Sequence, residues 1–448
     1  MKQRIDSTVV RSLACLLVFS GGGFLGFAAQ EADSPAPPPL GRSVTDVLTL
    51  DRAVRLALEN NPELRSSRGR IDAATGRAYQ AKLWTNPELT LGAEDWPTRG
   101  GGFSDAKKLV GVAQTVPFPG KKKLDRQIGV SGIRLSEAEL GLRRLELIRD
   151  VKTTFYQVLA AERLVDVAGE LVKVAESSAS AARKRVAAGA AADQEQLRAE
   201  ILFEQARTEL SGFERELVAA RQTLALLLGR PDLGETPVSG SLAETANLNL
   251  LDHGPEQWLA NHPSVVAVKS SRDRAELELR RARLEPYPDV RFGLAGGRDS
   301  GPAGGGIVQF GLSVPLPLID RSKGRKQEAQ ANLRIAEADQ VGAEQRLLRA
   351  WGTTRKRFRT AVEQVTNYRE RILPKANEAL RLVQTGFEQG KFGFIDLLDT
   401  QRTTAEVRLA YQQKLLELNV AQAELEALVA RTPGPVTPME TNPSQTKP

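Results

Sequence analysis

Two long stretches of the chain place apolar residues three to four positions apart, with polar residues between them. They cover residues 121–188 and 320–388, and the second contains no proline from 321 to 373. This spacing predicts α-helices whose apolar stripes need partner helices. At about 1.5 Å per residue, each helix would span roughly 100 Å. A compact domain needs no such rod, so the pattern favours a protein that crosses a wide gap.

Pro374 interrupts the second of these stretches. A proline inside a helix removes a backbone hydrogen bond and either ends or kinks the helix. The apolar pattern resumes with Ala376, Leu380 and Val383. We therefore expect a kink at Pro374 within a continuing helix rather than a helix end.

Four short segments alternate apolar and polar residues, which is typical of β-strands. The predicted strands are 88–95, 109–116, 289–295 and 307–314. Each is long enough to cross a bilayer when tilted, with one face toward lipid and the other toward water. Half-buried strands of a soluble protein show the same alternation, so the strands alone leave both interpretations open.

A shift of 201 residues aligns the two halves of the chain, placing Gly189 on Gly390 and Arg230 on Arg431. Each half reads helix, strand, strand, long helix, helix. The first helices are predicted near 50–84 and 255–285, and the last near 193–228 and 394–430. The fold class is therefore mainly α with a small β part, built from two tandem repeats.

The repeat and the composition together predict how the chain is divided. Residues 1–28 are a signal peptide, 29–48 a Pro-rich disordered segment, 49–230 the first repeat, 231–254 a linker, 255–431 the second repeat, and 432–448 a disordered Pro-rich tail. Low hydrophobicity and many prolines are the basis for both disordered assignments.

The leader has the layout of a secretory signal peptide, with basic residues, a short apolar run and small residues where cleavage after Ala28 needs them. An N-terminal membrane anchor is the alternative, although the apolar run is short and contains three consecutive glycines. Cys15 raises the possibility of lipidation, although Ser12 stands where a lipid-attachment signal has a large apolar residue. No later run reaches the roughly 18 apolar residues of a spanning helix, so any membrane span would use strands.

Four strands cannot close a barrel, and lipid does not tolerate open strand edges. Closure needs about eight strands or more, and a cyclic trimer of this chain would supply twelve. The membrane interpretation therefore requires symmetric assembly.

Composition argues against catalysis and against nucleic-acid binding. The formal net charge is +7, without a concentrated basic patch beside aromatic residues along the sequence. The chain has two histidines, and its one cysteine lies in the leader. We find no phosphate-binding loop, metal-ligand cluster or nucleophile motif, and so expect no cofactor, no bound metal and no enzymatic activity.

The chain resembles the TolC-like outer-membrane efflux proteins over nearly its whole mature length. The segments that carry the resemblance are Leu50–Pro62, Asn86–Gly92, Val314–Arg325 and Leu373–Leu398. The Pro-Leu-Pro-Leu-Ile-Asp-Arg run in the third segment is most similar to the branch that serves heavy-metal cation exporters.

The resemblance implies a homotrimer with a twelve-stranded barrel in outer-membrane lipid and an α-helical tunnel in the periplasm. The tunnel tip would dock on a periplasmic adaptor protein linked to an inner-membrane pump, for which we favour the RND type. The duct would pass heavy-metal cations. Drugs or secreted polypeptides are alternative cargoes, and a periplasmic coiled-coil scaffold without a pore is an alternative function.

The resemblance also implies a periplasmic gate that contains the carboxylates Asp396 and Asp399. At i and i+3 the two lie on one helix face, and rings of such carboxylates attract cations. Alternatively, both acids only stabilise the first turn of their helix through its dipole. In the first repeat, Glu195 and Arg198 hold the equivalent positions, either as local ion pairs of a closed tip or as a solvated helix face.

Gly189 and Gly390 mark the two predicted helix-to-helix turns, where glycine allows a left-handed backbone. By resemblance, the turns and the neighbours Lys391 and Phe392 would contact the adaptor. The glycines act as helix caps in either case.

Overall fold

The computed structural model describes residues 47–95, 106–243, 246–252, 254–298 and 304–429, which all belong to the unit that begins at Val47. The predicted signal peptide with Cys15, most of the Pro-rich segment 29–48 and the tail 432–448 lie outside the described residues.

The described residues are mainly helical with one small sheet, as predicted. The helices are α1 (Leu50–Asn60), α2 (Pro62–Lys82), α3 (Lys121–Ala187), α4 (Asp193–Leu227), α5 (Pro263–Arg283), α6 (Lys323–Asn367), α7 (Leu373–Glu388) and α8 (Phe394–Val429). The strands are β1 (Glu88–Glu94), β2 (Lys107–Val116), β3 (Val290–Arg298) and β4 (Gly306–Ser313).

The single helix predicted near 50–84 is wrong, because the structure has two helices there: Asn61 caps the end of α1 and the start of α2. The Asn61 side-chain oxygen accepts hydrogen bonds from the amides of Glu63 and Leu64 at 2.9 and 3.3 Å. Pro62 has no amide hydrogen with which α1 could continue. An N-cap followed by proline therefore divides this stretch into two helices.

The helix predicted near 255–285 begins only at Pro263, since the short 3₁₀ turns η4 (Pro255–Gln257) and η5 (Leu259–Asn261) precede it. His262 caps α5, and its Nδ1 accepts a hydrogen bond from the Ser264 amide at 3.2 Å. Burial lowers the pKa of His262. The cap thus depends on a neutral imidazole.

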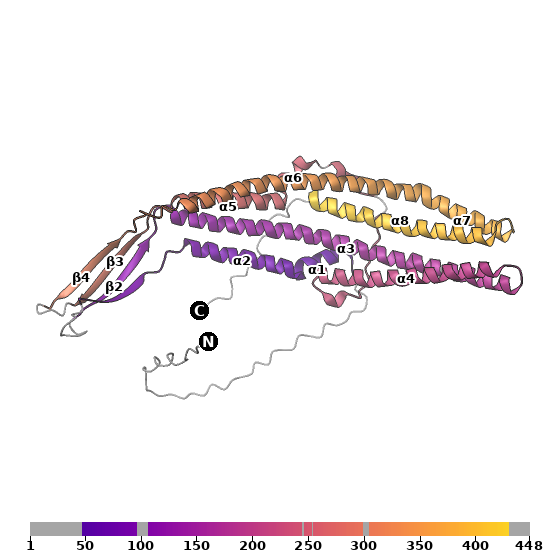
Figure 1. Cartoon of the computed structure of the whole chain (residues 1–448), viewed down its shortest axis with the longest axis horizontal. Helices are drawn as coiled ribbons and strands as arrows, with labels where there is room; N and C mark the ends of the chain where they lie inside the picture. The colour runs from indigo at the N-terminus through magenta and orange to yellow at the C-terminus, as the bar shows by residue number, and fades with distance from the viewer. Residues whose placement is uncertain (1–46, 96–105, 244–245, 253, 299–303, 430–448) are drawn as a thin grey trace, which may run out of the picture. The chain divides into compact units, whose positions relative to one another are not determined.

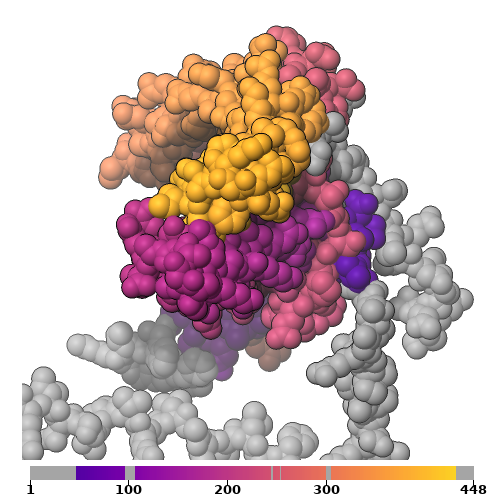
Figure 2. Space-filling view, turned by 90° about the vertical axis from the view of Figure 1, so that its right-hand side faces the viewer, coloured from indigo at the N-terminus to yellow at the C-terminus, as the bar shows by residue number. Residues whose placement is uncertain are grey.

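The helices form a single layer with α3 in its middle (Figure 1). Nearer the sheet the neighbours are α2, α3, α5 and α6 in this order, and farther from it α4, α3, α8 and α7. Figure 2 shows the orange, yellow and magenta helices stacked one above another. Within the described part of the chain, α2 and α4 form one edge of the layer, and α6 and α7 form the other.

The main core lies where α1, α3, α4, α6 and α8 meet in the middle of the layer. Its largest fully buried side chains include Phe155 of α3, Phe358 of α6 and Leu418 of α8. Val238 and Leu242, from the segment predicted as a linker, are also buried there. The connection between the halves therefore contributes to the core.

The same segment is held by hydrogen bonds on both sides. The Ser239 amide donates to the carbonyl of Leu48 at 2.9 Å, next to a parallel bridge between Leu48 and Val238. The Asn419 side chain of α8 accepts from the amide of Ala243 and donates to its carbonyl, both at 3.1 Å. Leu48 was predicted to be disordered, but it is 3% exposed, because the packed linker offers it a strand partner.

All four predicted strands are present, with limits that shift by up to three residues. They form one antiparallel sheet in the order β1-β2-β3-β4. The central pair, β2 with β3, joins the two halves of the chain. The edges of the sheet are β1 and β4.

One face of the sheet is covered by large, exposed apolar side chains. The registers place on it Leu89, Leu91, Val110, Val112, Phe292, Leu294, Val308, Phe310 and Leu312. On the other face, Arg291 pairs with Glu88 at 2.6 Å across β2. Gly111 lies there, and a Cβ on it would approach the Cβ of Ala295 to 2.7 Å. The sheet is thus apolar on one side and polar with small residues on the other.

The helix continues through Pro374, directly after a π-helical turn at Tyr368–Ile372. The Leu373 amide donates to the carbonyl of Tyr368, five residues earlier. A π turn shifts the hydrogen-bond ladder by one residue, which accommodates the missing amide hydrogen of proline.

Candidate functional site

The two hairpins, α3–α4 and α7–α8, turn back through the same local geometry. Gly189 and Gly390 have φ angles of 70° and 71°. At the first turn, the Ala190 amide donates to the carbonyl of Arg185 at 2.8 Å, and at the second the Lys391 amide donates to the carbonyl of Gly386 at 2.7 Å. Both turns are Schellman motifs, which need a left-handed residue at this position.

The second turn presents an exposed cation and an aromatic ring. Lys391 is exposed, and Phe392 is 45% exposed. A Cβ on Gly386 would clash with the Phe392 ring, so the ring rests directly on the backbone of α7. Such a half-exposed, fixed ring is suited to contact with another protein.

Asp396 and Asp399 are both exposed in the first two turns of α8. The Asp396 carboxylate accepts a hydrogen bond from the Gly393 amide at 2.9 Å, so it does stabilise the start of the helix. The opposite face of α8 is apolar and buried, through Phe394, Leu397 and Leu398. The two carboxylates therefore lie on the face directed away from that packing.

Of the two alternatives for Glu195 and Arg198, a local ion pair between them does not form among the described residues. Glu195 Oε2 lies 3.3 Å from Nη1 of Arg185, at the end of α3, while Arg198 is exposed. The α3–α4 turn folds the end of α3 back beside the start of α4. A partner on the facing helix is therefore closer to Glu195 than its i+3 neighbour.

Arg185 also contacts the other hairpin. Its Cζ lies 5.6 Å from the ring centroids of both Phe387, at the end of α7, and Phe394, at the start of α8. The facing Arg185 Nη1 and Glu195 Oε2 atoms are buried and make no hydrogen bond, so their attraction is Coulombic rather than directional. Arg185 thus links the two hairpins.

A small apolar cluster, the tip cluster, holds the hairpins together beside Arg185. It consists of Ala179, Ala182, Ala199, Phe394, Leu397 and Leu398. The alanines come from α3 and α4 and let α8 approach closely. A groove of about 870 Å³ lies beside this cluster between α3, α4 and α8, and it includes the exposed side chains of Leu197 and Ile201.

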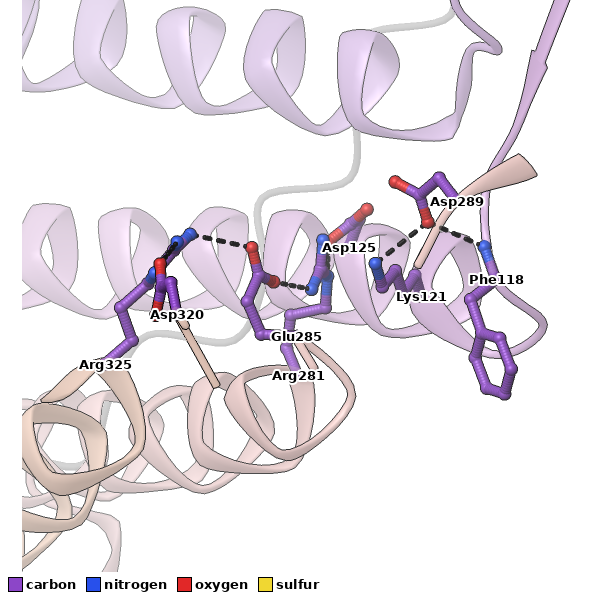
Figure 3. A network of polar contacts seen from close by, with 8 residues as sticks. All are labelled: Phe118, Lys121, Asp125, Arg281, Glu285, Asp289, Asp320 and Arg325. Atoms are coloured by element: carbon purple, nitrogen blue, oxygen red, sulfur yellow. Dashed lines mark hydrogen bonds and ion pairs between the residues drawn. The ribbon is translucent and has the colours of Figure 1, made fainter. Parts of the chain in front are cut away.

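A second set of polar contacts lies where the strands meet the helices (Figure 3). The Lys121 ammonium and the Phe118 amide both donate to the Asp289 carboxylate at 2.8 Å. The Lys121 side chain is 6% exposed. Burial alone would raise the pKa of Asp289, but the hydrogen bonds from Lys121 and Phe118 and the positive charge of Lys121 outweigh it, so this pKa lies below its usual value.

The network continues from α5 to the start of α6. Arg281 pairs with Asp125 at 2.8 Å and with Glu285, and Glu285 also pairs with Arg325 at 2.9 Å. Arg325 contacts Asp320 at 3.2 Å as well. These contacts connect the two strand-to-helix segments with the start of α3 and the end of α5.

Comparison with known proteins identifies the family. A model described as "Outer membrane efflux protein" matches residues 53–230 and 254–431, which is most of the chain. The chain belongs to the outer membrane efflux protein family. The predicted resemblance, the transport role and the outer-membrane location are confirmed.

Individual relatives cover nearly the whole length of this efflux protein. The cobalt-zinc-cadmium resistance protein CzcC of Cupriavidus metallidurans is 27% identical over 413 residues, which are 90% of this chain and 96% of the relative. A membrane protein from Pseudomonas aeruginosa has a similar crystal structure, with a TM-score of 0.75, 22% identity and coverage of 85% of this chain and 93% of that one. CusC gives a TM-score of 0.73 at 15% identity, covering 85% of this chain and 92% of that one. The two structures show that the fold is shared.

Two negative findings apply to the described residues of the efflux protein. They contain no helix long and apolar enough to cross a membrane. They also contain no group of three or more His, Cys, Asp and Glu side chains placed to hold a metal ion. The matched family consists of efflux proteins, which is consistent with the expectation that this chain is not an enzyme.

The gate residues expected from the sequence lie at the tips of the two hairpins, but the residue that connects the hairpins was missed. Arg185 is ten residues from Glu195 and about two hundred from Phe387 and Phe394. No local spacing links these residues. The one signal in the sequence is a basic residue in the last turn of a helix, which normally only complements the helix dipole.

Proposed function

We propose that this protein is the outer-membrane duct of a tripartite efflux system, formed by three copies of the chain. The copies pair edge to edge, so that their sheets close a twelve-stranded barrel in the membrane and their helix layers close a periplasmic tunnel. The observation that carries this proposal is a sheet with large apolar side chains along one face and, among the described residues, no strand partner on either outer edge.

The sheet argues for closure within lipid. Its apolar face carries nine exposed large side chains across all four strands, which suits contact with acyl chains. The outer edges of β1 and β4 have no strand partner among the described residues. Unpaired backbone groups are not tolerated in lipid, so β4 of one copy has to pair with β1 of the next.

The helix layer has complementary open edges. Exposed apolar residues of α4 outside the groove include Val218 and Leu226, and those of α6 and α7 include Ile335, Val341, Leu348 and Leu382. Packing the edge formed by α2 and α4 of one copy against the edge formed by α6 and α7 of the next would bury these residues. Such head-to-tail contacts form a closed ring when the rotation between copies closes.

The gate of this duct would lie at the hairpin tips. Three copies would bring six carboxylates, from Asp396 and Asp399, around one mouth, where like charges repel and cations are attracted. Arg185 with Glu195 and the tip cluster would hold the hairpins in the closed position, while Arg198 stays on the exposed surface. Pro374 and its π turn give α7 a point at which it can bend when the hairpins part.

The tips would also form the docking site for a periplasmic adaptor. Gly189 and Gly390 shape two matching turns, Lys391 and Phe392 are exposed on one of them, and the apolar groove between α4 and α8 lies beside them. An adaptor helix could fill that groove and connect the duct to an inner-membrane pump, for which we propose the RND type.

Heavy-metal cations are the cargo that we favour. The relative CzcC is named for resistance to cobalt, zinc and cadmium, and the carboxylate mouth suits cations. No resident metal site is required, since a duct needs weak, transient contacts with its cargo. Drugs and polypeptides remain alternative cargoes.

The assembly is tested by native mass spectrometry of the mature protein in mild detergent, combined with conductance in planar bilayers. We expect trimers that conduct. A monomer, or a protein that stays in solution without detergent, would refute the duct.

The gate is tested by ion selectivity in the same bilayers. Asp396→Asn/Asp399→Asn should lower the preference for cations severalfold. The control Asp51→Asn/Glu59→Gln removes two exposed carboxylates from α1 and should leave selectivity unchanged. Equal selectivity of wild type and the Asp396/Asp399 variant would remove the gate assignment.

A further inference from the structure

Six exposed basic side chains gather where the strands meet the helices. This set, the junction belt, consists of Lys123, Arg126, Arg283, Arg321, Lys323 and Lys326. The first two lie at the start of α3, Arg283 ends α5, and the last three lie at or just before the start of α6. Among the described residues, none of the six forms an ion pair.

The acids of the junction are already neutralised by other basic residues. Asp289 pairs with Lys121, Asp125 with Arg281, and Asp320 with Arg325, as Figure 3 shows. The segments 117–126, 280–289 and 315–326 contain eleven Lys and Arg but four Asp and Glu. Their excess of seven positive charges equals the formal net charge of the whole chain. The belt is the part of this excess that stays unpaired and exposed.

The linear sequence does not reveal this patch, because three segments far apart in the chain supply it. Two of them are the strand-to-helix connections of the two repeats, and the third is the end of α5. The fold brings them together because α3 packs on α5 and α5 packs on α6.

Exposed apolar side chains accompany the belt on the side of the sheet. Leu316, Leu318 and Ile319, which connect β4 to α6, are 70%, 72% and 99% exposed. Trp84, just before β1, is 58% exposed. From the sheet toward the helices, the surface therefore changes from apolar strands to exposed apolar and aromatic residues and then to cations. A protein shows this order where it passes from acyl chains through the interface to the headgroups.

We propose that the junction belt binds the phosphate headgroups of anionic phospholipids in the membrane leaflet nearest the helices. This inference rests on the proposed function, because the strands must span the membrane for the belt to reach that leaflet. Phosphate suits the belt, since Arg and Lys both bind it with charge-assisted hydrogen bonds. Bound lipid would fix the depth and the tilt of the duct at the point where the salt-bridge network holds sheet and helices together.

The test compares lipid retention by charge variants of one helix. Arg321→Ala/Lys323→Ala/Lys326→Ala removes half of the belt. The control Arg334→Ala/Arg346→Ala/Arg349→Ala removes three exposed basic residues farther along α6. Each protein is incorporated into nanodiscs of phosphatidylcholine with an equal share of phosphatidylglycerol, re-extracted, and analysed for co-purified lipid by native mass spectrometry. Single-channel conductance confirms that each is assembled.

Wild type and control should retain phosphatidylglycerol in preference to phosphatidylcholine. In the belt variant the ratio of retained phosphatidylglycerol to phosphatidylcholine should be about tenfold lower. High salt should reduce the preference of the wild type in the same direction. A charge-conserving variant, Arg321→Lys/Lys323→Arg/Lys326→Arg, should retain phosphatidylglycerol like the wild type. If assembled, conducting wild type and belt variant retain the same lipids, the inference is wrong and the duct stands. If the wild type neither inserts nor conducts, the duct and the inference fail together.

Discussion

Replacement of Arg185 by alanine should favour the open state of the duct. Arg185 is the charged link between the α3–α4 and α7–α8 hairpins, through Phe387, Phe394 and Glu195. Each cation–π contact contributes about 0.5–1 kcal/mol. The side chains of Arg185 and Glu195 are 36% and 24% exposed, and their ion pair adds about 0.5 kcal/mol.

Together these contacts stabilise the observed packing of the two hairpins, which is the closed state in our proposal, by about 2 kcal/mol in each copy; this corresponds to about a 30-fold shift of a two-state equilibrium. Planar-bilayer recording measures the consequence directly. Arg185→Ala should increase the fraction of time spent in high-conductance states, most clearly at low salt.

The matched control is Arg183→Ala. Arg183 lies half a turn from Arg185 but pairs with Glu200 of its own hairpin, at 2.9 Å. Replacing it removes one positive charge at the same level of α3 but leaves the contacts between the two hairpins in place. If both variants behave like wild type, or if both open equally, the contacts of Arg185 with the second hairpin do not hold the gate.

Three further predictions concern local stability. His262→Asn should make the stability of the start of α5 insensitive to mild acid. Burial lowers the pKa of His262 below its value in the unfolded chain, so the stability of the wild type falls as the pH drops below about 6.5. Hydrogen exchange of the α5 amides at pH 5 and pH 7.5, in wild type and variant, measures the difference. Gly390→Ala should destabilise the α7–α8 tip by about 1 kcal/mol because φ is positive there, whereas Gly69→Ala, in open space on α2, should be neutral or stabilising; equal hydrogen exchange at the α7–α8 turn in both would contradict the cap. Asp289→Asn should lower the thermal unfolding midpoint at pH 7. The lowered pKa of Asp289 makes its contact with Lys121 stabilising above about pH 4 and lost below that pH, so the variant should lack the decrease in midpoint that this contact causes in the wild type on acidification. A variant whose midpoint decreases with acid as much as that of the wild type would contradict this role.

The kinds of element, their order and most of their limits were predictable from the sequence. The strand from Gly306 to Ser313 and the rod from Lys121 to Ala187 follow from alternation and from three-to-four spacing, because those periods reflect the geometry of strands and helices. The break at Asn61 was missed, although asparagine followed by proline is a helix-start signal. There the apolar pattern continued through the cap and concealed it.

The candidate site was predictable only in part. Gly189, Gly390, Asp396 and Asp399 could be placed at the hairpin tips because turn glycines and helix starts are local features. An i+3 partner for Glu195 was one of two alternatives, and neither included Arg185, which the facing helix supplies. Which side chain faces which across a helix pair depends on the packing of that pair and not on spacing along one helix.

The sequence by itself determined the elements, the repeat, the family and the alternation that makes one sheet face apolar, because each is a property of neighbouring residues or of their periodicity. The tertiary structure alone decided that Arg185 contacts both hairpins, that the linker enters the core through Val238, and that three separate segments bring exposed basic residues to one junction. These features depend on distances between segments up to about two hundred residues apart. Such distances are set by how helices and strands pack, which no local pattern of side chains encodes.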